Sequence, residues 1–219
     1  MSDTYTVKQG DYLTKIAAQF GFVDINTIWD DQQNANLKKK RKNPNVLFPG
    51  DQLFIPDKKP RHESVVTERS HRFELKKPKI RLRLVLEDAY GNPIANASCE
   101  LTVEDQTFTV ISDDKGEIEQ EIPANAQKAT TLILKHPDNP INDELIPIQI
   151  GHLDPVDEVS GQKARLNNLG YFAGDPDDDD ETQFPSAVEE FQCEHMDRSE
   201  VDGKCGPKTQ AKLLEVHGC

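Results

Sequence analysis

YTVKQGDYLTKIAAQFG, residues 5–21, decides how the chain begins to fold. Its first residues alternate between apolar and polar, which predicts a short strand, and the pair Gly10 and Asp11 then breaks that strand. From Leu13 onward, apolar residues recur at helical spacing until Gly21, which is typical of a helix end. The segment therefore predicts a strand, a tight turn and a helix in succession.

The next residues complete a small unit. INTIW at 25–29 keeps the helical spacing, which predicts a second helix from about residue 24, and Trp29 shares the helical face of Ile25, so we expect it in the core. After a polar loop, residues 52–55 return as a strand. Residues 1–57 are thus expected to form a β-α-α-β unit.

These segments, together with NPNVLFPGDQLFIP at 43–56, resemble the LysM module, which binds N-acetylglucosamine-containing glycans such as peptidoglycan and chitin. In that family the sugar lies in a shallow groove between the loop after the first strand and the loop before the second. Backbone amides in such loops suit hydroxyl and N-acetyl groups, and apolar side chains suit the C–H faces. The resemblance implies these glycan-binding residues: Gly10, Asp11, Tyr12, Leu13, Asn45, Val46, Leu47, Phe48 and Pro49.

Two features depart from the LysM pattern. Tyr12 stands where the family usually has a small hydroxyl residue, and QQNANLKKKRKN at 32–43 lengthens the loop beside the groove. They favour a second hypothesis, in which the unit keeps its fold but docks proteins instead of glycan.

The middle of the chain changes character. Residues 58–79 are polar and basic and are bounded by prolines, and we expect a linker. Residues 80–150 contain short alternating segments separated by turns, which predicts an antiparallel β-sandwich. VLEDAYGNPIANASCELTV at 85–103 and DDKGEIEQEIP at 113–123 resemble the transthyretin-like or carboxypeptidase-regulatory-like sandwich, whose default role is that of a spacer.

Residues 151–219 have helical periodicity in three segments. The strings LGYF at 169–172, AV at 187–188, FQ at 191–192, DG at 202–203 and GP at 206–207, followed by Thr209, resemble the three-helix peptidoglycan-binding module of type 1. The resemblance implies a second wall-binding unit, with Tyr171 and Phe172 as its ligand-side candidates. The whole chain is therefore expected to be a multidomain α+β protein.

Charge and composition limit the classes of partner that the chain can bind. The formal charge of −13 is distributed as 0, +5, −8 and −10 over the four segments 1–57, 58–79, 80–150 and 151–219, which argues against nucleic acid as a partner. The sequence shows neither a secretory signal pattern nor an apolar run long enough for a membrane span. We expect cytoplasmic synthesis, with delivery to the periplasm or exterior by a route other than a cleaved signal.

Three features bear on chemistry. The acidic residues at 175–181 alternate like the first ligands of an EF-hand, but Asp180 and Ser186 stand where glycine and a bidentate glutamate are needed, so a solvated acidic turn is favoured over calcium. His217-Gly218-Cys219 matches the nucleophile string of L,D-transpeptidases without the large β-domain that those enzymes need. Three of the four cysteines, Cys193, Cys205 and Cys219, would allow a local disulfide in an exported chain, but their spacing does not predict a zinc site. No metal, cofactor or catalytic residue is predicted.

The sequence thus predicts a non-catalytic protein that binds peptidoglycan or a related N-acetylglucosamine polymer. Two wall-binding modules in a chain without a secretory signal resemble proteins of type VI secretion or other contractile injection systems, in which spike, baseplate or effector proteins would be partners. The alternatives are a protein adaptor without glycan binding and an accessory subunit of a cell-wall hydrolase.

Overall fold

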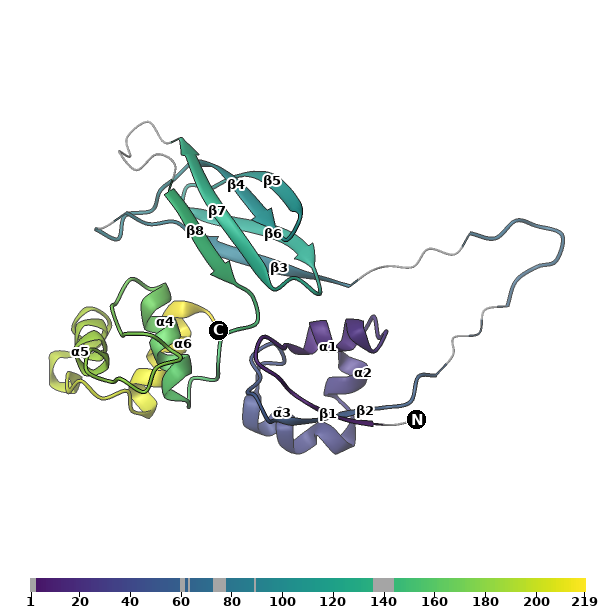
Figure 1. The fold of residues 1–219 in the computed structure, drawn as a ribbon, viewed down its shortest axis with the longest axis horizontal. Helices are drawn as coiled ribbons and strands as arrows, with labels where there is room; N and C mark the ends of the chain where they lie inside the picture. The colour runs from purple at the N-terminus through teal and green to yellow at the C-terminus, as the bar shows by residue number, and fades with distance from the viewer. Residues whose placement is uncertain (1–2, 60–61, 63, 73–77, 89, 136–143) are drawn as a thin grey trace.

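The computed structural model describes residues 3–59, 62, 64–72, 78–88, 90–135 and 144–219. Parts of the expected linker, 60–61, 63 and 73–77, and the connection 136–143 lie outside this description. The chain forms a small α/β unit, an antiparallel β-sandwich and a helical unit (Figure 1). Between the first two units, the described residues of 58–78 form no helix or strand.

The first unit is built on two paired strands. β1 (Asp3–Thr6) and β2 (Gln52–Ile55) are antiparallel, and α1 (Leu13–Gln19) and α2 (Asn26–Trp29) pack on them. The core contains Trp29, as predicted, and is completed by Val7, Leu13, Ile16, Ala17, Phe22, Ile28, Leu47, Leu53 and Ile55. Burial of this apolar set holds the short elements together, because none of them is long enough to be stable alone.

The segment predicted as a polar loop is in fact helical. A 3-10 turn, η1 (Gln32–Asn34), leads into α3 (Ala35–Arg41). Its alanine, leucine, lysines and arginine are good helix formers, although the apolar spacing that reveals an amphipathic helix is absent. The buried Asn34 side chain fixes its start by donating to the carbonyls of Ile28 and Phe54 and accepting from the Phe54 amide.

The sandwich consists of two antiparallel sheets. β3 (Lys79–Val85) pairs with β6 (Glu117–Pro123), and the second sheet has the order β5 (Gln106–Ile111), β4 (Ser98–Val103), β7 (Lys128–Lys135) and β8 (Glu144–Gln149). Inward-facing apolar residues of both sheets meet between them, which confirms the alternation in the sequence. The core residues include Leu86, Ile94, Ala97, Cys99, Leu101, Val103, Ile118 and Ile122.

The helical unit contains α4 (Val159–Asn168), α5 (Phe184–His195), a 3-10 turn η2 (Arg198–Glu200) and α6 (Pro207–His217). Its core is formed by Leu166, Tyr171, Ala173, Phe184, Ala187, Val188, Phe191 and Leu213. The buried Gln192 ties α5 to the following loop: its amide nitrogen donates to Asp202 and Thr209, and its oxygen accepts from the main-chain amides of Asp202 and Gly203. Several residues of the strings that resemble the type 1 module therefore stabilise the fold of this unit.

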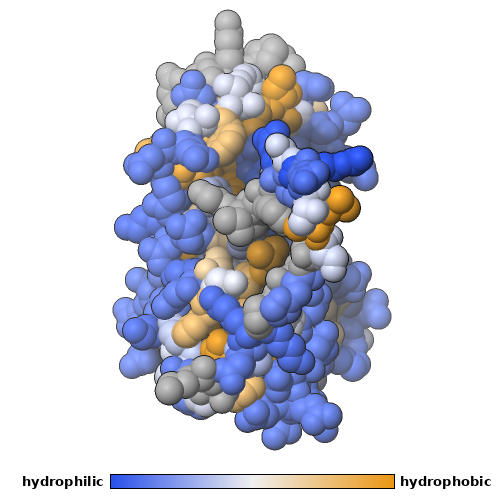
Figure 2. Space-filling model, turned by 90° about the vertical axis from the view of Figure 1, so that its right-hand side faces the viewer, coloured by the Kyte–Doolittle hydropathy of each residue, from blue (hydrophilic) through white to orange (hydrophobic). Residues whose placement is uncertain are grey.

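On the face seen in Figure 2, hydrophilic side chains predominate and hydrophobic ones show in limited patches. No helix in the described part of the chain is long and apolar enough to cross a membrane.

Candidate functional site

The structure brings the two predicted loops of the first unit together. The Leu13 amide donates to the Pro44 carbonyl over 3.2 Å, and the Thr14 hydroxyl donates to the Asn45 side-chain oxygen over 3.0 Å. These bonds join the loop after β1 to the loop before β2. The groove expected from the sequence is thus bounded by loops that support each other.

Asp11 organises the first loop from within. Its carboxylate accepts hydrogen bonds from the Tyr5 hydroxyl at 2.7 Å and the Lys8 amide at 3.0 Å, and it forms an ion pair with Lys15 at 3.1 Å. Burial alone would raise the pKa of Asp11, but these bonds and the lysine charge together lower it. Because Asp11 is buried and its oxygens are occupied, it shapes the loop and offers little to a ligand.

Arg41 and Asp51 organise the second loop, and sequence reasoning missed both. The Arg41 guanidinium donates to the Asp51 carboxylate at 2.7 and 3.1 Å, and the same carboxylate accepts from the Phe48 amide at 3.0 Å. The guanidinium also lies over the Phe48 ring, 5.4 Å from its centroid. Burial opposes the charge of Asp51, but the arginine partner lowers its pKa nevertheless. The sequence signal that could have indicated Asp51 is the PGD string at 49–51, directly before β2.

The Tyr12 side chain lies in the sandwich and not in the groove predicted for the first unit. Its side chain is 2% exposed and belongs to the sandwich core cluster that contains Leu101, Val103 and Ile122. The hydroxyl lies 2.9 Å from the Ala124 carbonyl oxygen and 2.8 Å from that of Ala126, and it shares its proton between them. Burial is the main cause that raises the pKa of this phenol, so it remains a neutral donor. Tyr12 therefore joins two units.

The residues after the sandwich complete this contact. Gly151 has φ +82°, and a Cβ placed on it would lie 2.5 Å from Tyr12 Cδ1 and 2.9 Å from the Gly10 carbonyl oxygen. A Cβ on Gly10 would in turn lie 3.0 Å from His152 Nε2. The two main chains approach this closely only because both positions are glycine. Arg41 adds a second link, an ion pair with Asp157 at 3.5 Å.

Few of the predicted residues in the first unit remain accessible. Asn45 is exposed, and Phe48 and Pro49 are partly exposed. The other six are buried: Gly10, Asp11, Tyr12, Leu13, Val46 and Leu47. Their assignment as glycan-binding residues stays a prediction, and of the predicted residues only Asn45, Phe48 and Pro49 in the second loop present surface to a ligand.

In the helical unit, the two predicted aromatic residues behave differently. Tyr171 is 8% exposed and packs edge-to-face on Phe191, with ring centroids 5.6 Å apart. Its hydroxyl donates to Glu194 over 2.6 Å and lies 3.0 Å from His195 Nε2. Phe172, its neighbour in sequence, is 72% exposed. Of the pair, Phe172 is available to a ligand, whereas Tyr171 supports the adjoining surface from below.

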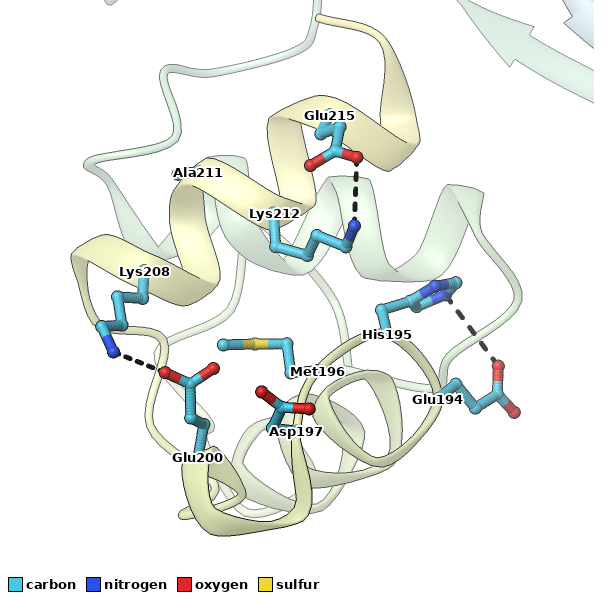
Figure 3. Close-up of a pocket in the computed structure, with 9 residues that line it drawn as sticks. All are labelled: Glu194, His195, Met196, Asp197, Glu200, Lys208, Ala211, Lys212 and Glu215. Atoms are coloured by element: carbon cyan, nitrogen blue, oxygen red, sulfur yellow. Dashed lines mark hydrogen bonds and ion pairs between the residues drawn. The ribbon is translucent and has the colours of Figure 1, made fainter.

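That adjoining surface is an open groove with a volume of about 660 Å³ between the end of α5, η2 and α6 (Figure 3). Met196 and Ala211 are its apolar members, and two ion pairs, Lys208 with Glu200 and Lys212 with Glu215, lie along it. The remaining lining residues are Glu194, His195 and Asp197. Sequence reasoning missed this groove, because charged residues on exposed helix faces carry no pattern that separates a site from ordinary surface.

The acidic turn in this unit is organised around a lysine. The Lys163 side chain is 1% exposed, and its ammonium donates to the carbonyl oxygens of Asp175, Asp178 and Asp180 at 3.3, 2.8 and 2.8 Å. A cation from α4 thus holds the turn through its main chain, while the acidic side chains are exposed. Among the described residues, no group of three or more histidine, cysteine or acidic side chains could hold a metal ion.

The segment 217–219 has the character of an unreactive thiol site. The His217 Nδ1 atom lies 3.3 Å from the Cys219 sulfur. Burial raises the pKa of the Cys219 thiol, and burial together with the nearby Arg165 charge lowers the pKa of His217 to about 4. A weakened base beside a thiol that resists ionisation does not favour nucleophilic chemistry. All four cysteines are free in the structure.

Comparison with known families identifies the two outer units. Residues 5–56 match the LysM domain, and residues 156–213 match the family described as "Putative peptidoglycan binding domain". No curated protein and no solved structure matched the chain. The chain therefore combines a LysM domain and a helical peptidoglycan-binding domain, with an antiparallel β-sandwich between them.

Proposed function

We propose that this is a non-catalytic protein that binds peptidoglycan, and that its helical domain makes the accessible contact with the wall. The observation that carries the proposal is the presence of two domains of wall-binding families in one chain, of which the helical one has an open groove. The ligand class is a polymer of N-acetylglucosamine and its peptide-substituted partner sugar.

The chemistry of the helical domain suits this ligand. Phe172 offers an exposed aromatic face, which matches the C–H faces of a pyranose ring. The groove offers carboxylates, ammonium groups and an imidazole, which match hydroxyl, acetamido and stem-peptide groups. Lining of this kind gives orientation with modest affinity, and a polymer compensates for modest affinity by repeating its sites.

We also propose a setting for the protein. The architecture noted in the sequence resembles that of proteins associated with type VI secretion or other contractile injection systems. In such a system the protein would reach the periplasm or exterior through the injection machine, and the sandwich would act as a transthyretin-like spacer. Spike, baseplate or effector proteins would be its protein partners.

The test is retention on insoluble peptidoglycan sacculi. We expect the wild-type chain to be retained and Phe172→Ala to be retained about fivefold less or weaker still, which corresponds to roughly 1 kcal/mol for an exposed aromatic contact. Tyr90→Ala is the matched control, because Tyr90 is an aromatic residue with 89% exposure on the sandwich. Equal retention of the wild type and Phe172→Ala would exclude the proposed contact.

A protein adaptor is the second candidate function. Its supporting observation is Tyr12, which departs from the LysM pattern and is buried in a protein contact. In this alternative the LysM fold serves protein docking alone. Absence of retention on sacculi at every salt concentration would favour the adaptor over the wall-binding protein.

A further inference from the structure

The first loop of the LysM domain and a glycan would need the same space. The family's groove places sugar against the loop after the first strand, which here is Gly10 to Leu13. Residues 10–13 are buried, whereas Lys8 and Gln9 at the start of the loop are exposed, and Tyr12 is inserted into the sandwich core. His152 covers Gly10, since even one added carbon on Gly10 would meet its ring at 3.0 Å.

Several hydrogen-bonding groups of the loop are also engaged. The Gly10 carbonyl accepts from the Lys15 ammonium over 2.8 Å, and the Leu13 amide donates to Pro44. The Tyr12 hydroxyl is bonded to the connection between β6 and β7, at Ala124 and Ala126. A sugar would have to displace the sandwich before it could reach this loop.

We propose that the sandwich is an autoinhibitory partner of the LysM domain: insertion of Tyr12 closes the groove, and glycan binding requires its release. The inference rests on the proposed function, because it assigns the LysM groove to N-acetylglucosamine oligomers. It also gives Tyr12 a role that accounts for its departure from the small hydroxyl residue usual in the family.

The second loop is coupled to the same closed state. Arg41 holds Asp51 and covers Phe48 in that loop, and it also reaches Asp157 in the segment before α4. Asp157 is largely exposed, so this ion pair is a weak link that water and salt readily compete with. The Tyr12 contact therefore dominates the closure, and the arginine orients the domain against its neighbours.

Closure implies an order of events at the wall. The helical domain, whose groove and Phe172 are accessible, makes the first contact. Release of Tyr12 then adds the LysM groove as a second site on the same polymer, at the high effective concentration that tethering provides. The protein would bind the wall tightly only after the LysM domain has separated from the sandwich.

A variant can open the contact from the sandwich side and leave every groove residue unchanged. Gly151→Ala would place a carbon 2.5 Å from the Tyr12 ring and 2.9 Å from the Gly10 carbonyl. Gly91→Ala is the matched control: Gly91 has a similar positive φ, +75° against +82°, and nothing within 4 Å of the added carbon. Both substitutions place a side chain at a positive φ, but only Gly151→Ala disturbs the contact.

The experiment is calorimetric titration of the full chain with chitohexaose, a soluble N-acetylglucosamine oligomer. If closure lowers the competent fraction, we expect about tenfold tighter binding in Gly151→Ala and wild-type affinity in Gly91→Ala. Tyr12→Ser, which restores the family's small hydroxyl residue, should also bind more tightly and covers the case in which Gly151→Ala fails to fold.

The outcomes separate this inference from the proposed function. Equal chitohexaose affinity in the wild type, Gly151→Ala and Tyr12→Ser would overturn closure, as would no binding by any of them. If sacculi still retain the wild type in either case, the proposed function stands without the inference. Loss of retention on sacculi by all variants would overturn both.

Discussion

Lys163→Met would remove the cation that holds the acidic turn of the helical domain. Three carbonyl oxygens lie within 3.3 Å of the ammonium, which is almost completely buried. Hydrogen bonds to charged groups contribute about 1.5–3 kcal/mol each, but the freed carbonyls belong to a partly exposed turn and regain water. The net cost is therefore expected to be about 2–4 kcal/mol.

That cost is large for a domain of this size. A domain of about 60 residues has a total stability of only a few kcal/mol, and each kcal/mol shifts its Tm by roughly 4–8 °C. Scanning calorimetry of the full chain should show the transition of the helical domain lowered by about 10–25 °C, with the other transitions unchanged. Lys204→Met is the control, because Lys204 is an exposed lysine of the same domain.

A Tm for Lys163→Met equal to that of Lys204→Met would refute this reasoning. It would mean that the acidic turn is held by its own side chains or is not part of the cooperative fold. The sign of the change in Tm is also informative. A Lys163→Met variant more stable than the wild type would show that burial of the ammonium destabilises the domain more than its three hydrogen bonds stabilise it.

Three further predictions follow from the same structure. Tyr12→Phe keeps the ring but leaves the carbonyls of Ala124 and Ala126 without their donor, and urea unfolding should show a loss of about 1–2 kcal/mol; an unchanged midpoint would mean that the hydroxyl is not bonded in solution. Gln192→Ala removes the bonds that tie α5 to the loop at 202–203, and far-UV circular dichroism should show a helical transition destabilised by about 2–4 kcal/mol, whereas a loss below that of Tyr12→Phe would contradict the role given to Gln192. The folded pKa of His217 is lowered to about 4, below its usual value of 6.5, so the stability that depends on neutral His217 is complete above pH 6.5 and is lost as the pH falls towards 4. Relative to His217→Gln, the free energy of unfolding of the wild type should fall by about 1–2 kcal/mol between pH 7 and pH 5. Parallel pH profiles would show that the surroundings of His217 do not lower its pKa.

The local elements were largely predictable from residue patterns. Alternation predicted β3 to β8, and helical spacing with glycine and proline signals predicted α1, α4, α5 and α6. These patterns work because each element has one face in a core. The helix α3 was missed because it is polar nearly all round and is held by side-chain anchors, Asn34 and Arg41, that no periodicity reveals.

The candidate sites were less predictable, for a physical reason. Tyr12 follows the Gly-Asp turn, where the LysM resemblance places a groove residue. Its burial depends on the sandwich, more than a hundred residues away in the chain. In the acidic turn, the sequence draws attention to the carboxylates, whereas the turn is stabilised by hydrogen bonds from the Lys163 ammonium of α4 to main-chain carbonyl oxygens. Contacts between units and main-chain acceptors leave no local trace in a sequence.

The central claim is tested most directly by NMR titration of the full wild-type chain with soluble peptidoglycan fragments. The account predicts shifts concentrated at Phe172 and at the groove residues of α5, η2 and α6, with residues 10–13 unaffected at low ligand concentration. Shifts at residues 10–13 with a silent groove, or no shifts at all, would contradict it.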